Sequence, residues 1–201
     1  MDFTTLKGNL EKNGFKVTCF ETSQDAKEYL TEEIKNTTVA FGGSITLQDM
    51  GLYESLSNNN DVFWHWNIPE GKTAKDMLDA SKNADIYMTS ANGISESGEI
   101  INIDGTGNRV AAISHGHKKV YIVAGKNKIA PDFEKALFRA RNIAAPLNAK
   151  RLSRKTPCAQ NADKCYDCSS PERICRNLSV LYIKPSGAEY EVVLINENMG
   201  Y

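Results

Sequence analysis

The sequence lacks several features that would place the protein in a broad class. No apolar run approaches the length of about 18 residues that a membrane-spanning helix needs. The first residues, MDFTTLKGNLEKNGFK, are polar and lack the apolar core of a signal peptide, so we expect a cytoplasmic protein. The net charge of −1 lacks the basic excess typical of nucleic-acid binding. We therefore expect neither a membrane nor a nucleic-acid partner. The apolar fraction of 41% favours a globular fold.

Cysteine is scarce, and its distribution is uneven. Of the five cysteines, Cys19 stands alone and the other four lie within 18 residues. Residues 149–176 also hold seven basic and three acidic side chains, a formal charge of +4, so the remainder carries −5. The near-neutral chain therefore combines an acidic body with a basic, thiol-rich segment.

Short apolar runs alternate with stretches of helical periodicity over the first 125 residues. This alternation is typical of an α/β fold with a mainly parallel sheet and helices on both faces. The expected strands are 15–20, 37–41, 61–66, 84–90 and 119–124, and the expected helices are 3–12, 23–34, 73–81 and 131–142. A further helix is expected after Ser44, with Leu47, Met50 and Leu52 facing inward.

Glycine and proline mark two turns that predict hairpins. Gly93 and Gly98 separate two short extended pieces. Further along, Pro185-Ser186-Gly187 separates the runs 179–184 and 189–195, which we expect to pair as a C-terminal two-stranded hairpin. The predicted organisation is an α/β body over 1–148. A cysteine-rich segment with this hairpin, over 149–201, is expected to pack on the same domain.

The first candidate site is the turn after the expected strand 37–41, where Gly42 and Gly43 precede Ser44 and Thr46. Glycine lets backbone N–H groups face a ligand, and the start of a helix carries partial positive charge. Open α/β sheets also bind ligands at the carboxyl ends of their strands. The four residues therefore predict a pocket for a phosphate or carboxylate. The alternative is a tight turn in which Ser44 only caps the helix.

A second polar turn, Asp104 to Arg109, is expected at the same edge of the sheet. A cation at the start of a helix is unfavourable, so Arg109 indicates an anionic partner, either a ligand or Asp104. Asp104 and Glu96 are candidate general acid–base residues if they are buried. The alternatives are a turn-forming Asp104 and a solvated Glu96. The predicted anion-binding residues of this turn are Gly105, Gly107, Asn108 and Arg109.

The three histidines give weaker signals. His115 and His117 have i, i+2 spacing and no nearby carboxylate pattern, so we interpret them as part of a loop rather than as metal ligands. His65 lies between Trp64 and Trp66 in an expected strand. These exposed aromatics are either a ligand wall or an interface of a homo-oligomer.

The strongest signal is the spacing Cys158-x6-Cys165-x2-Cys168-x6-Cys175. A central C-x2-C is the chelating unit of zinc and iron–sulfur sites, and thiols stay reduced in the cytoplasm. A four-thiolate centre would carry a net charge of about −2, which the basic segment would balance. The spacing predicts a metal site and leaves zinc and an iron–sulfur cluster open. The alternative is a set of free or buried cysteines.

Three stretches together resemble the LUD-domain family, the group that includes lactate utilization protein C. They are Val39 to Thr46, Asp104 to Ala112 and Lys118 to Ile129, and the resemblance extends to the cysteine tail from Thr156 to Cys175. It implies a fold like that of ribose-5-phosphate isomerase, glucosamine-6-phosphate deaminase and coenzyme A transferases. In those relatives a Gly/Ser/Thr loop after a strand typically holds a phosphate or carboxylate.

Two functions follow from these observations. The first is binding of a small anionic metabolite, linked through the resemblance to lactate or related organic-acid utilization. The second is a metal or iron–sulfur accessory protein that transfers electrons with an iron–sulfur partner, since lactate-oxidising family members act with such partners. The motifs are specific to the family rather than to a reaction.

Overall fold

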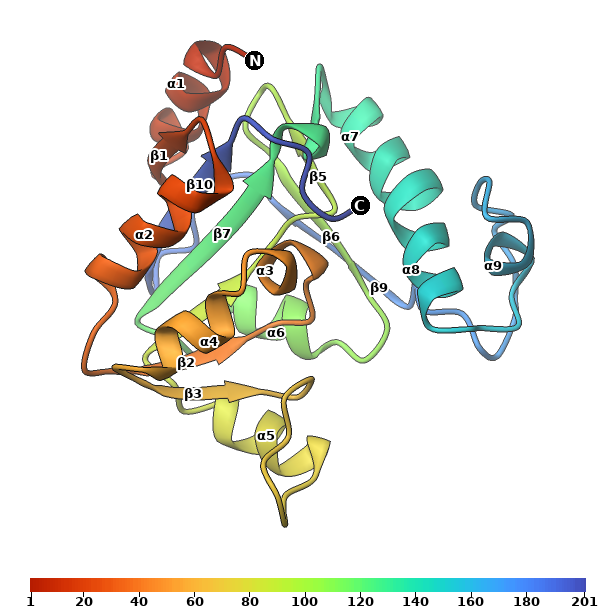
Figure 1. Ribbon diagram of the computed structural model, residues 1–201. Helices are drawn as coiled ribbons and strands as arrows, with labels where there is room; N and C mark the ends of the chain where they lie inside the picture. The colour runs from red at the N-terminus through yellow and green to blue at the C-terminus, as the bar shows by residue number, and fades with distance from the viewer.

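A computed structural model describes residues 1–201, and a six-stranded parallel sheet forms its centre (Figure 1). All five strand pairings in this sheet are parallel. The strands in spatial order are β1 (Lys16–Phe20), β10 (Glu189–Ile195), β7 (Lys119–Gly125), β4 (Ile86–Thr89), β2 (Thr38–Phe41) and β3 (Asp61–Trp64). The predicted α/β class with a mainly parallel sheet is confirmed.

Helices cover both faces of this sheet. Successive strand residues point to opposite sides, so the apolar strands present apolar side chains on both faces, and helices bury both. In β7, Val120 and Ile122 join one apolar cluster, whereas Tyr121 and Val123 join the other. The first cluster includes side chains of α1 (Thr4–Lys12) and α6 (Asn108–Ser114). The second includes α2 (Ser23–Glu33), α3 (Ile45–Asp49) and α4 (Leu52–Ser57). Helix α5 (Ala74–Ser81) lies beside β3, at the edge of the sheet (Figure 1).

A second sheet has four strands in the order β8 (Ile129–Ala130), β5 (Gly93–Ser95), β6 (Ile100–Asp104) and β9 (Asn177–Leu181). Strands β5 and β6 are antiparallel neighbours, which confirms the hairpin predicted at Gly93 and Gly98. The turn η1 (Lys126–Lys128) links β7 to β8 and so joins the two sheets.

The helix predicted over 131–142 begins later and continues further. Helix α7 (Phe133–Arg139) passes through a π-helical turn, Ala140–Ala144, into α8 (Ala145–Arg151). Pro146 has no N–H to donate one turn back, and its ring crowds that carbonyl, which accounts for the widened turn. The extra length carries the end of α8 to the carboxyl side of the sheet. The helix predicted after Ser44 is interrupted at Gly51, whose φ of 61° separates α3 from α4.

The predicted C-terminal hairpin is wrong. Strand β9 pairs antiparallel with β6, whereas β10 inserts between β1 and β7 in the other sheet. Strand β10 is buried at every position after Glu189, as a central parallel strand requires. A hairpin would have left one of its faces in water. Between α8 and β9, the cysteine segment holds only α9 (Pro157–Asn161) as regular structure.

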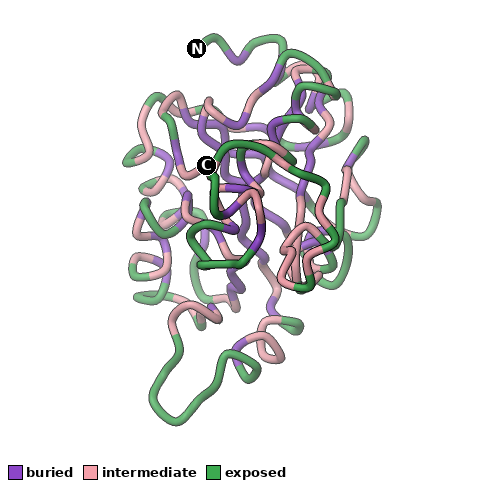
Figure 2. Tube along the Cα trace, turned by 90° about the vertical axis from the view of Figure 1, so that its right-hand side faces the viewer, coloured by how far each residue is buried: buried purple, intermediate pink, exposed green.

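Buried segments gather in the strands, and exposed ones lie on the surrounding helices and loops (Figure 2). No helix of the chain is both long enough and apolar enough to cross a bilayer.

Candidate functional site

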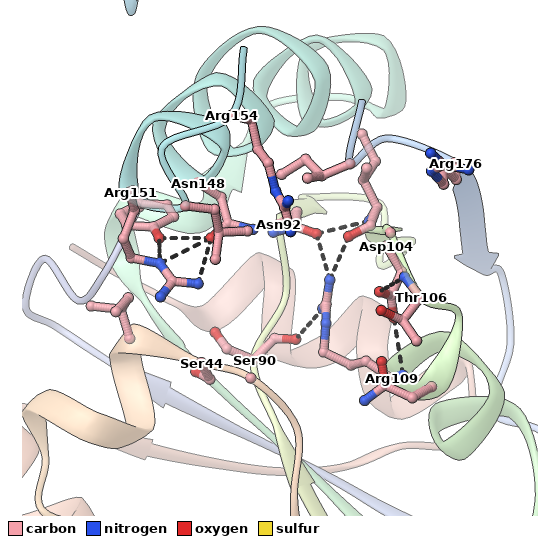
Figure 3. A pocket seen from close by; sticks show the side chains of 18 of the residues that line it. Ser44, Ser90, Asn92, Asp104, Thr106, Arg109, Asn148, Arg151, Arg154 and Arg176 are labelled. Atoms are coloured by element: carbon pink, nitrogen blue, oxygen red, sulfur yellow. Dashed lines mark hydrogen bonds between the residues drawn. The ribbon is translucent and has the colours of Figure 1, made fainter. Parts of the chain in front are cut away.

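A cavity of about 530 Å³ lies at the carboxyl ends of β2, β3 and β4 (Figure 3). The residues that follow these three strands line it: Gly43 and Ser44 after β2, His65 and Trp66 after β3, and Ser90 to Asn92 after β4. The turn after β6, the end of α8 and the cysteine segment complete its walls. This is the edge at which parallel sheets bind ligands.

Hydroxyl groups form the floor of the cavity. Ser44 and Ser90 are 7% exposed, and Thr46 is 1% exposed. The Ser44 Oγ accepts a hydrogen bond from the Leu47 N–H at 3.2 Å, so it caps α3 as the alternative interpretation expected. The Ser90 Oγ donates to the Thr46 Oγ1 at 3.4 Å. Three of the four residues predicted in this loop therefore line the cavity.

Gly42 has a packing role behind the cavity wall and does not line it. A Cβ at this position would lie 2.7 Å from the Tyr87 Oη and 3.1 Å from the Arg109 Cδ. At Gly43, which lines the cavity, a Cβ would lie 3.0 Å from the Trp66 ring. Both glycines are needed because other side chains approach the backbone closely.

The second predicted turn reaches the cavity through five residues, whereas Gly107 does not line it; the five are Asp104, Gly105, Thr106, Asn108 and Arg109. Gly107 has a φ of 90° and marks the start of α6, which accounts for its glycine. The Asp104 carboxylate accepts the backbone N–H groups of Thr106 at 3.2 Å, Arg109 at 2.9 Å and Val110 at 3.2 Å. Asp104 therefore anchors the turn, as in the alternative interpretation.

The Arg109 guanidinium binds protein oxygens at the floor. Its Nη1 donates to the Ser90 carbonyl at 3.5 Å and to the Asn102 side chain. Its Nη2 donates to the Asn92 Oδ1 at 3.1 Å and to the Ile103 carbonyl at 2.6 Å. Burial lowers the pKa of Arg109, and Asp104 partly offsets this effect. The guanidinium stays protonated, so it ties β4 to β6 and contributes charge to the floor.

Glu96 lies outside the cavity, in the turn between β5 and β6. Its backbone carbonyl accepts from the Asn9 side chain at 2.7 Å. The two loop histidines also lie elsewhere: His115 is exposed, and the ring of buried His117 stacks on Tyr87.

His65, in contrast, lines the cavity, and its Nδ1 is buried without a hydrogen-bond partner. Burial lowers the pKa of His65, so the ring is neutral near pH 7. Trp66 supplies an aromatic wall, and its ring stacks on Trp64 with 5.1 Å between centroids.

The charge of the cavity is strongly positive. Six cations line it against two carboxylates, a formal charge of +4 with His65 neutral. No Asp or Glu side chain lies within 4.0 Å of any of these cations, since the ion pairs of the molecule all involve other basic residues. The cations are Arg109, Lys128, Arg151, Arg154, Arg173 and Arg176, and the carboxylates are Asp104 and Glu172.

Sequence reasoning identified only Arg109 among these six as a site residue. The basic residues of 149–176 had been assigned to balance thiolates, and nothing in the sequence distinguished those that face the cavity. Lys128, at the end of η1, is 2% exposed, and its Nζ donates to the Tyr201 carbonyl. Burial, together with Arg139 and Arg109, lowers the pKa of Lys128 to about 7.

The four clustered cysteines are free and half-buried. No group of three or more His, Cys, Asp or Glu side chains is arranged to hold a metal ion. Cys165 and Cys175 line a second cavity of about 250 Å³ together with Arg173. Arg173 donates to the Cys168 carbonyl at 2.8 Å, and the neighbouring Cys175 side chain raises the pKa of the guanidinium.

The cysteine segment also contacts the first cavity directly. The Arg176 N–H donates to the Asp104 carbonyl at 3.0 Å. Ile174 lies so close to Gly105 that a Cβ there would be 3.1 Å from the Ile174 carbonyl oxygen. The thiol-rich segment is therefore one wall of the cationic cavity.

Comparison with known proteins agrees with this architecture. A DUF162 family protein from Deinococcus radiodurans, known as a crystal structure, aligns with a TM-score of 0.55 at 12% identity, over 97% of this chain and 99% of that one. The β subunit of eIF2B from Chaetomium thermophilum aligns with a TM-score of only 0.32 at 12% identity, over 65% of this chain and 39% of that one. No curated protein sequence matches. Residues 4–195 match the LUD domain, and the chain therefore belongs to the LUD-domain family.

Proposed function

We propose that the protein binds a small anionic metabolite, a phosphate ester or a carboxylate, in the cavity at the carboxyl ends of β2, β3 and β4. The observation that carries the proposal is the set of six cations that line one cavity without an Asp or Glu partner. The whole chain has a net charge of −1, so this concentration of positive charge is local.

Charge of one sign in a partly enclosed site raises the free energy of the empty protein, because the cations repel one another away from bulk water. An anion would relieve this repulsion and form charge-assisted hydrogen bonds, which are stronger than neutral ones. The Ser44 hydroxyl would add a neutral donor at the floor, because its own O–H is unused. The O–H groups of Ser90 and Thr46 already donate to the Thr46 Oγ1 and to the Met199 carbonyl. The family resemblance adds lactate or related organic-acid utilization as the metabolic setting of the proposal.

His65 replaces Asp104 and Glu96 as the acid–base candidate in this proposal. The Asp104 carboxylate is occupied by three backbone N–H groups, and Glu96 lies outside the cavity. The buried Nδ1 of neutral His65 has no hydrogen-bond partner within the protein. We assign no reaction to it.

Thermal unfolding in phosphate, against chloride at equal ionic strength, tests the proposal. A ligand at about 100 times its Kd stabilises the folded state by roughly 2.7 kcal/mol, which raises the Tm by roughly 5–11 °C for a chain of this size. Arg154→Glu should reduce the shift. The matched control Lys150→Glu changes the net charge equally on an exposed residue outside the cavity and should retain the shift. Equal shifts in both variants would contradict binding at this cavity, as would no shift in the unaltered protein.

A second candidate function uses the cysteine segment. We propose that Cys158, Cys165, Cys168 and Cys175 hold a zinc ion or an iron–sulfur cluster, in an accessory protein that works with an iron–sulfur partner. The donor set fits such a group in its chemistry, because the segment holds four free thiols and sulfur is a soft ligand for zinc and iron–sulfur centres. The segment also has little regular structure, and such segments commonly depend on a metal or disulfides for order.

Metal analysis of anaerobically purified protein tests this second function. About one metal or cluster per chain is expected, and Cys168→Ser should lower that content, whereas Cys19→Ser outside the segment should not. A content below about 0.3 per chain in the unaltered protein would contradict the proposal, because folded metal sites retain their ion.

A further inference from the structure

We infer that the ligand of the cationic cavity carries two anionic groups, one bound at the buried floor and one at the exposed rim, joined by a neutral, hydroxyl-bearing spacer. This inference rests on the proposed anion-binding function and adds the chemical class of the ligand. It follows from the way in which burial and unused hydrogen-bond donors divide the cavity into two levels.

The floor offers donors for one anion. The Ser44 Oγ accepts from the Leu47 N–H, which leaves its own O–H free to donate. The Lys128 Nζ has one protein partner, the Tyr201 carbonyl, so two of its three N–H groups are unused. Thr46 and Lys128 both contact the segment 199–201, which places them on the same side of the floor. All of these side chains are at least 93% buried.

The rim offers a second set of donors on exposed arginines. The Arg154 guanidinium forms no hydrogen bond or ion pair within the protein, and in Figure 3 it reaches from the segment after α8 into the cavity, between Arg151 and Arg176. Arg151 lies over the Trp66 ring at 4.7 Å, and Asn148 helps to hold it there.

Each of the two arginines beside Arg154 keeps one terminal nitrogen free. In Arg151 the Nε and Nη2 bond Asn148, and the Nε also bonds the Tyr201 Oη, so Nη1 is unused. In Arg176 the Nε and Nη2 bond the carbonyls of Arg173 and Pro171, which again leaves Nη1. Guanidinium groups with free terminal nitrogens are well suited to bind phosphate or carboxylate oxygens.

Neutral polar groups separate the two levels. Figure 3 places Ser44 and Ser90 on the side of the cavity opposite Arg154, with Asn92 between. The Asn92 Oδ1 is used by the Ile103 N–H and by Arg109, whereas its amide N–H₂ has no protein partner. Asn108 and Thr106 also line the cavity with side chains that have no protein partner. Such groups match hydroxyls rather than a charge, and a volume of about 530 Å³ suits a small organic molecule better than a single inorganic anion.

Calorimetric titration with matched pairs of probes tests the inference. The pairs are fructose 1,6-bisphosphate with fructose 6-phosphate, and 3-phosphoglycerate with glycerol 3-phosphate, with inorganic phosphate as the simplest anion. The two pairs differ in spacer length. We expect at least one probe with two anionic groups to bind ten times more tightly, or better, than its partner with one anionic group. Arg154→Gln should bring the ratio of the two affinities close to one, and Lys150→Gln should leave the ratio unchanged.

The outcomes distinguish the proposed anion-binding function from the inference that the ligand carries a second anionic group. If neither phosphate nor any organic probe binds, the proposed anion-binding function itself fails. If phosphate binds and no pair differs by more than about twofold, the function stands and the inference of a second anionic group is overturned. A tenfold preference that survives in Arg154→Gln also overturns it, because the second group would then lie away from the rim.

Discussion

At the scale of single residues, Lys128 sets the pH dependence of anion binding. Its pKa is lowered to about 7 by burial and by Arg139 and Arg109, with Asp49 opposing. A bound anion would favour the protonated amine and raise this pKa, so binding takes up a proton above pH 7. We expect sulfate, which does not titrate in this range, to bind more weakly as the pH rises from 7 to 9. Calorimetry at several pH values measures the decline.

The variant Lys128→Met should weaken binding and remove most of this pH dependence. His65, the other titratable group in the cavity, has a lowered pKa and is already neutral above pH 7, so it does not contribute in this window. The conservative variant Lys128→Arg keeps a permanent charge and should bind sulfate with little dependence on pH. A decline with pH that is equal in all three proteins would assign the effect to another group.

The local sequence around each residue explains why only part of the site was predictable. Gly43, Ser44 and Asp104 lie in turns whose composition signals a strand end or a helix start, and the structure places all three at the cavity. Lys128 and Arg154 lie in ordinary sequence, and only the fold brings them there. The catalytic role predicted for Asp104 stays a prediction. Its carboxylate accepts three backbone N–H groups, and composition alone does not distinguish such a structural role from a catalytic one.

At the scale of helices and strands, the sequence predicted the alternating strands and helices. It missed the pairing of β10 and the continuation of α7 into α8. Strands β1, β2, β4 and β7 were recognised because short apolar runs alternate with helical periodicity. Residues 189–195, which form β10, were correctly predicted as a strand, but the strand predicted to pair with them was the wrong one. Turn residues at 185–187 favour a local hairpin, but a run buried on both faces is more stable in the centre of the sheet, and pairing with distant strands leaves no local signal.

The continuation of α7 into α8 is the second missed connection, and it matters for the site. Pro146 favours an interpretation in which a helix ends, whereas the chain accommodates it with a π-helical turn and continues to Arg151. This extension brings Asn148 and Arg151 to the rim. A helix that ended at residue 142 would not have placed these two residues at the rim.

At the scale of the whole molecule, the parallel sheet separates two regions of different charge. The carboxyl ends of the strands carry the unpaired cations of the cavity, whereas the amino ends carry a buried carboxylate with paired cations. Glu191 is fully buried, and Lys16 and Lys119 lie at 3.0 and 3.2 Å from its Oε2. Thr18 and Tyr29 donate to its Oε1 at 2.6 and 2.7 Å. Because its ions are paired within the protein, we interpret the amino end as structural and the carboxyl end as functional.

The buried Glu191 carboxylate predicts how the free energy of unfolding depends on pH. Burial alone would raise the pKa of Glu191, but hydrogen bonds from Thr18, Tyr29 and Lys16 outweigh it, so the pKa lies below its ordinary value. The stabilisation is therefore complete above the unfolded pKa and is lost as the pH falls through the lower folded pKa. Glu191→Gln should lower the free energy of unfolding at pH 7 by roughly 2–4 kcal/mol, since it leaves the lysines without their charge partner. In urea unfolding from pH 7 to pH 3, the difference in free energy of unfolding between the unaltered protein and Glu191→Gln should become smaller as the pH falls. The control variant Glu189→Gln changes an exposed residue of the same strand and should match the unaltered protein throughout. A difference that stays constant to pH 3 would show that Glu191 acts through packing rather than through its charge.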